Sequence, residues 1–129
     1  MKTLLAASAT LVALSLPAFA EGDAAKGEKE FNKCKACNMI ASDSETIVKG
    51  GKTGPNLYGV IGRTAGSYEG FKYSDGLAAK GAEGLVWDEA ELATFVKNPN
   101  DYLGSRSKMT FKLAKGGEDV AAYLATFSQ

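Results

Sequence analysis

Apolar residues recur at helical spacing near both ends of the chain. The set at the C-terminal end is spaced i, i+3, i+4, i+7 and consists of Val120, Tyr123, Leu124 and Phe127. This spacing predicts a helix that begins near Glu118 and Asp119, two acids suited to the positive end of the helix dipole. The other set predicts a helix that Asp23 caps and that runs toward Cys34; it consists of Ala24, Gly27 and Phe31.

The middle of the chain predicts further short helices joined by long loops. Asp88 and Glu91 are spaced like a capping box, and a helix with the buried stripe Leu92, Phe95 and Val96 is expected to follow. Asn98-Pro99 should end that helix, and residues 74–80 predict one more. No stretch alternates with a period of two, so no sheet is expected. The pattern therefore predicts an all-α domain of three to five short helices. Its core looks thin unless a large apolar cofactor fills the centre.

The first twenty residues predict an export signal. Lys2 is positive, residues 4–16 are apolar and uncharged, and Ala18-Phe19-Ala20 fits a small-x-small cleavage site. The apolar run is shorter than the roughly 20 residues of a membrane-spanning helix, which disfavours the alternative of an uncleaved anchor. We therefore expect residues 1–20 to be a cleaved signal peptide and residues 21–129 to form one domain.

The charge balance excludes one broad class of partner. The chain has 15 Lys and Arg residues against 15 Asp and Glu residues, so its formal net charge is zero. A general nucleic-acid binder would be expected to carry a strongly basic face. No nucleic-acid partner is therefore expected.

Both cysteines lie in one motif, CKACN, at residues 34–38. A CxxC motif is shared by covalent haem sites, redox dithiols and halves of zinc sites. Two cysteines in a chain without histidine cannot complete a four-ligand structural zinc site. A disulfide across so short a loop would stabilise little. In a haem c site both sulfurs bind the porphyrin vinyl groups, and the next residue points at the iron. Here that residue is Asn38.

Landmarks in order along the chain resemble the class I bacterial cytochromes c, particularly the small cytochrome c2 type. The matching stretches are GEKEFNKCKAC, GGKTGPNLYGVIGR, EGFKYSDGL, LVWDEAEL, FVKNPNDYL, KMTFKL and DVAAYLATF. The resemblance implies the cytochrome c fold, an all-α fold around one covalently bound haem, with the first and last helices crossing near Gly27, Phe31 and Tyr123. It also implies a soluble periplasmic one-electron carrier. The sequence shows no acid–base pair or nucleophile constellation, so an enzyme is not expected.

The resemblance assigns roles to individual residues. Cys34 and Cys37 would bind the haem, and Met109 would be the distal iron ligand. Pro55, in TGPNL, would stand at the proximal face, where its carbonyl usually accepts a hydrogen bond from the ligand histidine. Contacts to the haem propionates are implied for Arg63, Tyr73 and Trp87. The alternatives are a core methionine, a surface arginine and two core aromatic residues.

Two residues depart from the family pattern. Phe95 stands where the family usually has a tyrosine near the methionine ligand, so one polar contact is expected to be lost. Asn38 stands at the position of the proximal histidine, and an amide oxygen is a weak donor to haem iron. The hydrogen bond to Pro55 is therefore expected to be altered as well.

Three explanations of Asn38 stay open. The sequence can differ from a functional parent by one base, because histidine and asparagine codons differ only at the first position. Alternatively, the protein is a paralogue in which Met109 is the only strong ligand, which would make it an open-site haem sensor. In the third explanation the domain no longer acquires haem and keeps a CxxC dithiol.

The expected partners are membrane redox complexes. The resemblance suggests a quinol-oxidising cytochrome bc complex as donor, and a photosynthetic reaction centre or terminal oxidase as acceptor. A lysine-rich surface at the haem edge would steer docking, although scattered solvating lysines are the alternative. The basic set is Lys33, Lys35, Lys49, Lys52, Lys72, Arg106, Lys108, Lys112 and Lys115. The acids expected elsewhere are Glu28, Glu30, Asp88, Glu89, Glu91, Glu118 and Asp119. We expect a monomer without stable membrane insertion.

Overall fold

The protein is described here from a computed structural model, in which residues 22–127 are placed. The predicted signal peptide therefore lies outside the described residues. The helices are α1 (Ala24–Glu30), α2 (Asp75–Ala82), α3 (Glu89–Lys97), α4 (Pro99–Leu103) and α5 (Gly117–Ala125), with a 3-10 turn at Phe31–Lys33. The strands are β1 (Ile40–Ala41) and β2 (Thr46–Val48). The prediction of an all-α domain with three to five short helices is confirmed, apart from this small sheet.

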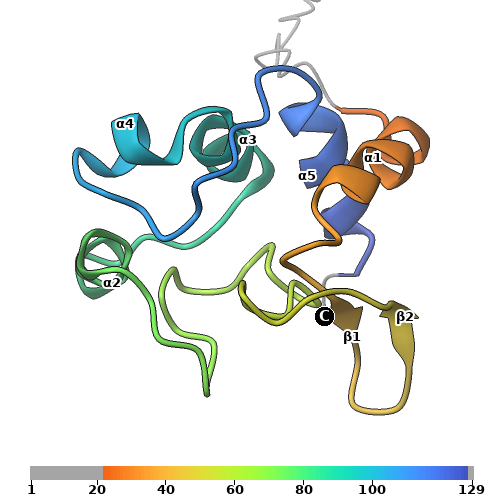
Figure 1. Ribbon diagram of the computed structural model, residues 1–129, viewed down its shortest axis with the longest axis horizontal. Helices are drawn as coiled ribbons and strands as arrows, with labels where there is room; N and C mark the ends of the chain where they lie inside the picture. The colour runs from red at the N-terminus through yellow and green to blue at the C-terminus, as the bar shows by residue number, and fades with distance from the viewer. Residues whose placement is uncertain (1–21, 128–129) are drawn as a thin grey trace, which may run out of the picture.

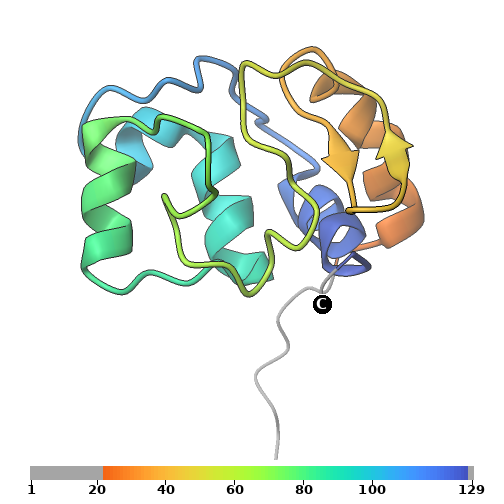
Figure 2. The same ribbon diagram turned by 90° about the horizontal axis from the view of Figure 1, so that it is seen from below.

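The helices divide the molecule into two ends and a middle. Figure 1 shows α1 and the strands at one end, α2 and α4 at the other, and α3 and α5 between them. The perpendicular view in Figure 2 shows the same order. Helix α5 packs against both α1 and α3, and α2 packs against α4. In the described part of the chain, no helix has the length and apolar character that crossing a membrane requires.

Local capping starts three of the helices where the sequence predicts them. Asp23 accepts hydrogen bonds from the backbone N–H groups of Ala25 and Lys26, and Ser74 accepts one from Leu77. Asp88 accepts one from Glu91 N–H at 2.7 Å, so the first half of the expected capping box is present. The second half would be a hydrogen bond from the Asp88 N–H to the Glu91 carboxylate. Among the described residues, the Glu91 carboxylate instead accepts a hydrogen bond from the Tyr102 hydroxyl.

The sequence prediction missed two elements. Strands β1 and β2 are antiparallel, with Ile40 opposite Val48, which corrects the expectation of no sheet. Strands of two and three residues are too short to show an alternating pattern. The predicted stop at Asn98-Pro99 does end α3, but α4 begins there as well. Proline fits the first turn of a helix, and Asn98 caps α4 through the N–H of Asp101 at 3.2 Å.

The crossing of α1 and α5 occurs where the resemblance predicts it. A Cβ atom on Gly27 would lie 1.9 Å from the Asp119 carbonyl oxygen, so only glycine permits this approach. The Phe31 and Tyr123 rings stack with centroids 5.8 Å apart. The N–H of Asp23 also donates to the Asp119 carboxylate at 2.7 Å. The first and last helices are thereby joined in one core.

Candidate cofactor site

A cavity of about 340 Å³ opens inside the domain, and every residue that the resemblance singles out as a site residue lines it. These residues are Cys34, Cys37, Asn38, Pro55, Arg63, Tyr73, Trp87 and Met109. Apolar side chains make up much of the remaining wall, among them Phe31, Leu57, Val60, Leu77, Leu92, Phe95 and Leu124. A concave, mainly apolar site with a few polar groups is typical of a cofactor pocket.

The two cysteines lie on one tight turn that follows α1. The N–H of Cys34 donates to the Phe31 carbonyl at 2.8 Å, which continues the 3-10 turn. The Cys34 carbonyl then accepts hydrogen bonds from Cys37 N–H at 3.1 Å and from Asn38 N–H at 3.0 Å. One backbone turn therefore presents both thiols and the Asn38 side chain to the cavity.

The segment 50–57 is bound to this turn by backbone hydrogen bonds. Gly51 N–H donates to the Lys35 carbonyl at 2.8 Å, and Gly54 N–H donates to the Cys37 carbonyl at 2.7 Å. Glycine is required here, because a Cβ atom on Gly50 would lie 2.0 Å from the Asn38 carbonyl oxygen. The turn that carries the cysteines is therefore fixed by main-chain contacts.

The Asn38 side chain is oriented by Pro55. Its Nδ2 donates to the Pro55 carbonyl oxygen at 2.9 Å. Because that carbonyl can only accept, the amide must present its nitrogen to Pro55 and its oxygen elsewhere. The hydrogen bond to Pro55, which the sequence led us to expect in altered form, is thus donated by an amide and not by an imidazole ring.

Met109 lies in the segment between α4 and α5, and side chains hold its backbone. The Met109 N–H donates to Ser107 Oγ at 3.0 Å, and the Ser107 N–H donates to Asn100 Oδ1 at 2.7 Å. Ser107 is buried, with 7% of its surface exposed. The sequence analysis missed Ser107 and Asn100. The available signal was a polar residue two positions before the predicted ligand.

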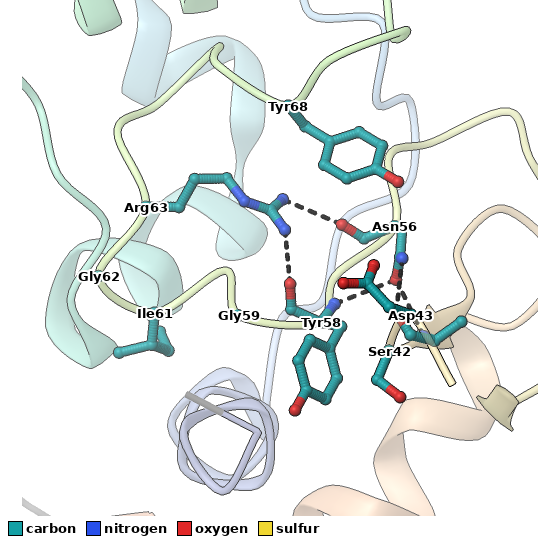
Figure 3. Close-up of a pocket in the computed structure, with 10 residues that line it drawn as sticks. Ser42, Asp43, Asn56, Tyr58, Gly59, Ile61, Gly62, Arg63 and Tyr68 are labelled. Carbon is teal, nitrogen blue, oxygen red and sulfur yellow. Dashed lines mark hydrogen bonds between the residues drawn. The ribbon is translucent and has the colours of Figure 1, made fainter. Parts of the chain in front are cut away.

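Arg63 is half-buried and bound to the backbone, as Figure 3 shows. Its Nη1 donates to the Asn56 carbonyl at 2.9 Å and its Nη2 donates to the Tyr58 carbonyl at 2.6 Å. The guanidinium carbon lies 4.9 Å from the centre of the Tyr68 ring. Burial lowers the pKa of Arg63, and neighbouring Tyr73 opposes that shift. Several N–H donors of the guanidinium remain for an anionic group.

An aromatic cluster closes another part of the wall. Trp87 is buried, and its ring centre lies 5.2 Å from that of Phe95. Phe95, where the resemblance implied a tyrosine, has no hydroxyl to donate. Tyr102 packs on Phe95 at 5.5 Å, but its hydroxyl donates to Glu91 Oε2 at 2.5 Å. Burial and then the hydrogen bond to Glu91 raise the pKa of Tyr102.

Thiol redox chemistry is poorly supported at this site. Burial, followed by the charges of Cys37 and Glu30, raises the pKa of Cys34 to about 11. Reactive cysteines in dithiol catalysts have lowered pKa values, because the thiolate is the nucleophile. In the described part of the chain, no three His, Cys, Asp or Glu side chains gather as a metal site would need. The paired thiols and the mainly apolar wall fit a covalently attached haem better.

The basic side chains expected at the cofactor edge are all exposed. Lys33 and Lys108 line the cavity itself, and Lys108 Nζ donates to the Lys72 carbonyl. One acid expected elsewhere lies beside them, because Glu30 pairs with Lys33 at 2.9 Å. The separation of charges is therefore incomplete at this point.

Comparison with known proteins identifies the family. No family model matches the chain. The chain is 58% identical to cytochrome c2 from Rhodobacter capsulatus across 96% of each protein. It is 53% identical to cytochrome c-550 from Paracoccus versutus, across 99% of this chain and 90% of that protein.

Solved structures agree with the sequence comparison. The structure of cytochrome c2 from Rhodobacter capsulatus matches with a TM-score of 0.79 and 60% identity, over 81% of this chain and 97% of that one. Ferric cytochrome c-550 from Paracoccus versutus matches with a TM-score of 0.79 and 55% identity, over 84% of this chain and all of that one. The chain therefore belongs to the cytochrome c2 and c-550 family of class I cytochromes c, and it is an electron carrier and not an enzyme.

Proposed function

We propose that this protein carries single electrons in the periplasm with one haem c, bound through thioether bonds to Cys34 and Cys37. The observation that carries the proposal is that both cysteines and Met109 line one mainly apolar cavity. The haem would supply the one-electron exchange between ferrous and ferric iron. Met109 would be the distal ligand, and a soft thioether favours ferrous iron and raises the potential.

The remaining residues would orient the haem and exclude water. Arg63 would bind a propionate with the donors that the backbone carbonyls leave available, and Tyr73 and Trp87 would contribute further contacts. The buried wall around Phe31 and Leu124 would keep water from the iron, which helps to set its potential.

We assign Asn38 to the proximal position. Its amide donates to the Pro55 carbonyl, as a ligand histidine of this family usually does through its ring N–H. Asparagine is a poor ligand for iron, so the spectrum should differ from that of a histidine/methionine haem. Restoring Asn38→His should produce a low-spin spectrum of that kind, and an unchanged spectrum would refute the assignment.

The proposed partners are membrane redox complexes: a cytochrome bc complex as donor, and a reaction centre or terminal oxidase as acceptor. Exposed lysines, including Lys33 and Lys108 at the cavity, support docking to acidic patches. We propose that the protein works as a monomer after residues 1–20 are removed. Electron transfer to such a complex should slow as ionic strength rises, and a rate independent of salt would count against steering.

Two measurements test the carrier function directly. The protein is produced in a periplasm together with cytochrome c maturation factors, and its intact mass and absorption spectrum are recorded. Covalent haem should add roughly 600 Da to the chain that remains after export. Cys34→Ala with Cys37→Ala is the matched control and should lack that mass. A wild-type chain without the added mass would overturn the proposal.

A further inference from the structure

The two ends of the Asn38 amide have different surroundings. Nδ2 is bound to the Pro55 carbonyl, whereas no described residue donates a hydrogen bond to Oδ1. Among the described residues, no buried side-chain oxygen or nitrogen lacks a partner, so Oδ1 is not sealed inside the protein. The open space that Asn38 lines is the cofactor cavity. The amide oxygen is therefore an available acceptor at the cavity wall.

The Asn38 side chain has little freedom to reach further into the cavity. A Cβ atom on Gly54 would lie 2.4 Å from Asn38 Nδ2, which shows how closely the backbone of segment 50–57 approaches the amide. The Asn38 N–H is bound to the Cys34 carbonyl at 3.0 Å, so the main chain cannot advance either. An amide also ends one atom short of the far nitrogen of an imidazole ring, since Oδ1 is one bond from Cγ and the imidazole Nε2 is two bonds from it.

We propose that the Asn38 side of the haem binds one small neutral ligand whose donor atom carries hydrogen, of the water and ammonia class. This inference rests on the proposed function, because the ligand needs the haem iron. The space between an amide and the far end of an imidazole is roughly that of one water molecule, about 30 Å³. The ligand's lone pair faces the iron, and its N–H or O–H donates to Asn38 Oδ1.

The fixed position of the Asn38 amide and the acceptor Oδ1 both restrict which ligand can bind. A ring as large as imidazole does not fit between the fixed amide and the iron. The bond from Nδ2 to Pro55 polarises the amide, which strengthens Oδ1 as an acceptor. Ligands that carry hydrogen on the donor atom gain this bond, whereas azide gains no such bond.

The test uses the haem-loaded protein in its ferric form, at alkaline pH where ammonia is neutral. Ammonia and imidazole are titrated separately while the absorption and electron paramagnetic resonance spectra are recorded. The near-infrared band of a thioether-ligated ferric haem reports whether Met109 stays bound. We expect ammonia to shift the spectra while that band is retained, and we expect imidazole to leave this side of the haem unchanged.

Three variants separate the effect of the Oδ1 acceptor from the effect of the space beside the amide. Asn38→Leu keeps similar bulk without an acceptor, and ammonia should bind about fivefold to tenfold more weakly, the worth of one hydrogen bond. Asn38→Ala widens the gap and should admit imidazole. Asn38→His should bind neither ligand on this side.

The outcomes distinguish failure of this inference from failure of the proposed function. A chain without covalent haem overturns both. A haem-loaded chain that does not bind ammonia overturns the inference alone, and so does ammonia binding with loss of the thioether band, which places the ligand on the Met109 side. Imidazole binding to the wild-type protein with Met109 retained also contradicts it. Since wild-type behaviour decides these points, they hold even if a variant fails to fold.

Discussion

The cavity has two walls that are built by different means. The turn that carries Cys34, Cys37 and Asn38 is bound to segment 50–57 by backbone hydrogen bonds and close glycine contacts. Met109 lies on a segment without regular structure. Near Met109, this segment is held by hydrogen bonds to the side chains of Ser107 and Asn100. Main-chain contacts survive most substitutions, whereas side-chain contacts can be removed one at a time. We therefore expect the cysteine wall to be rigid and the Met109 wall to be adjustable.

The strongest perturbation should come from Gly50→Ala, which attacks the cysteine wall. The added methyl group would lie 2.0 Å from the Asn38 carbonyl oxygen, so the backbone must separate there. We expect a loss of about 2–4 kcal/mol in the free energy of unfolding, measured with denaturant. Gly84→Ala is the control, because its surroundings are open and only its φ of +96° opposes a side chain. A loss near the control's value of about 1 kcal/mol would show that this wall is not rigid.

Ser107→Ala should affect the Met109 wall with a smaller energetic effect. It removes the acceptor for the Met109 N–H inside the protein, so the expected loss of stability is about 1–2 kcal/mol. The near-infrared thioether band should weaken and the reduction potential should fall, because Met109 is held less firmly. Ser105→Ala, at an exposed position, is the matched control. An unchanged band in the Ser107 variant would mean that haem ligation alone holds this segment.

Tyr102→Phe tests whether the aromatic cluster supports the Met109 wall or only stabilises the fold. It removes the hydrogen bond from the Tyr102 hydroxyl to Glu91 while the ring remains. We expect a loss of about 1 kcal/mol in the free energy of unfolding and an unchanged haem spectrum. Glu91→Gln keeps an acceptor for the hydroxyl and should lose less. A spectral change in Tyr102→Phe would link α4 to the proposed ligand Met109.

The smallest effect concerns Cys34 in the haem-free protein. Burial raises its pKa from the ordinary value of 9.0 to about 11, so folding favours the protonated thiol. The resulting stability is fully present below pH 9.0 and is lost as the pH rises through about 11. The rate of Cys34 alkylation, followed by peptide mass spectrometry as a function of pH, should show an inflection near the raised pKa of about 11. In denaturant it should move to the ordinary value of 9.0. The same inflection in both conditions would contradict the buried environment of the thiol.

The helices could be predicted because their determinants are close in sequence. Asp23, Ser74 and Asp88 each bond to a backbone N–H within three residues, and their helices begin as predicted. Helix α4 was missed because Asn98-Pro99 both ends one helix and begins the next. The short sheet was missed because its strands contain too few residues to establish a period.

The residues around the cavity divide in the same way. The family pattern named residues that share one cavity, since the order of motifs is visible along the chain. Ser107 and Asn100 were not predicted, because their hydrogen bond spans seven positions, from the loop after α4 back to the first turn of α4. Nothing in the sequence showed that Glu91 would bind Tyr102 in preference to completing its capping box.

The sequence by itself determined the helix starts, the apolar stripes, the CxxC motif and the presence of Asn38 beside it. These depend on residue identity and on contacts within about four positions. Only the tertiary structure decided that the Asn38 amide gives its nitrogen to Pro55, 17 positions away, and must turn its oxygen elsewhere. The physical reason is that a side chain with a donor end and an acceptor end takes its orientation from its neighbours in space. Chain folding brings those neighbours together, and the local sequence does not specify them.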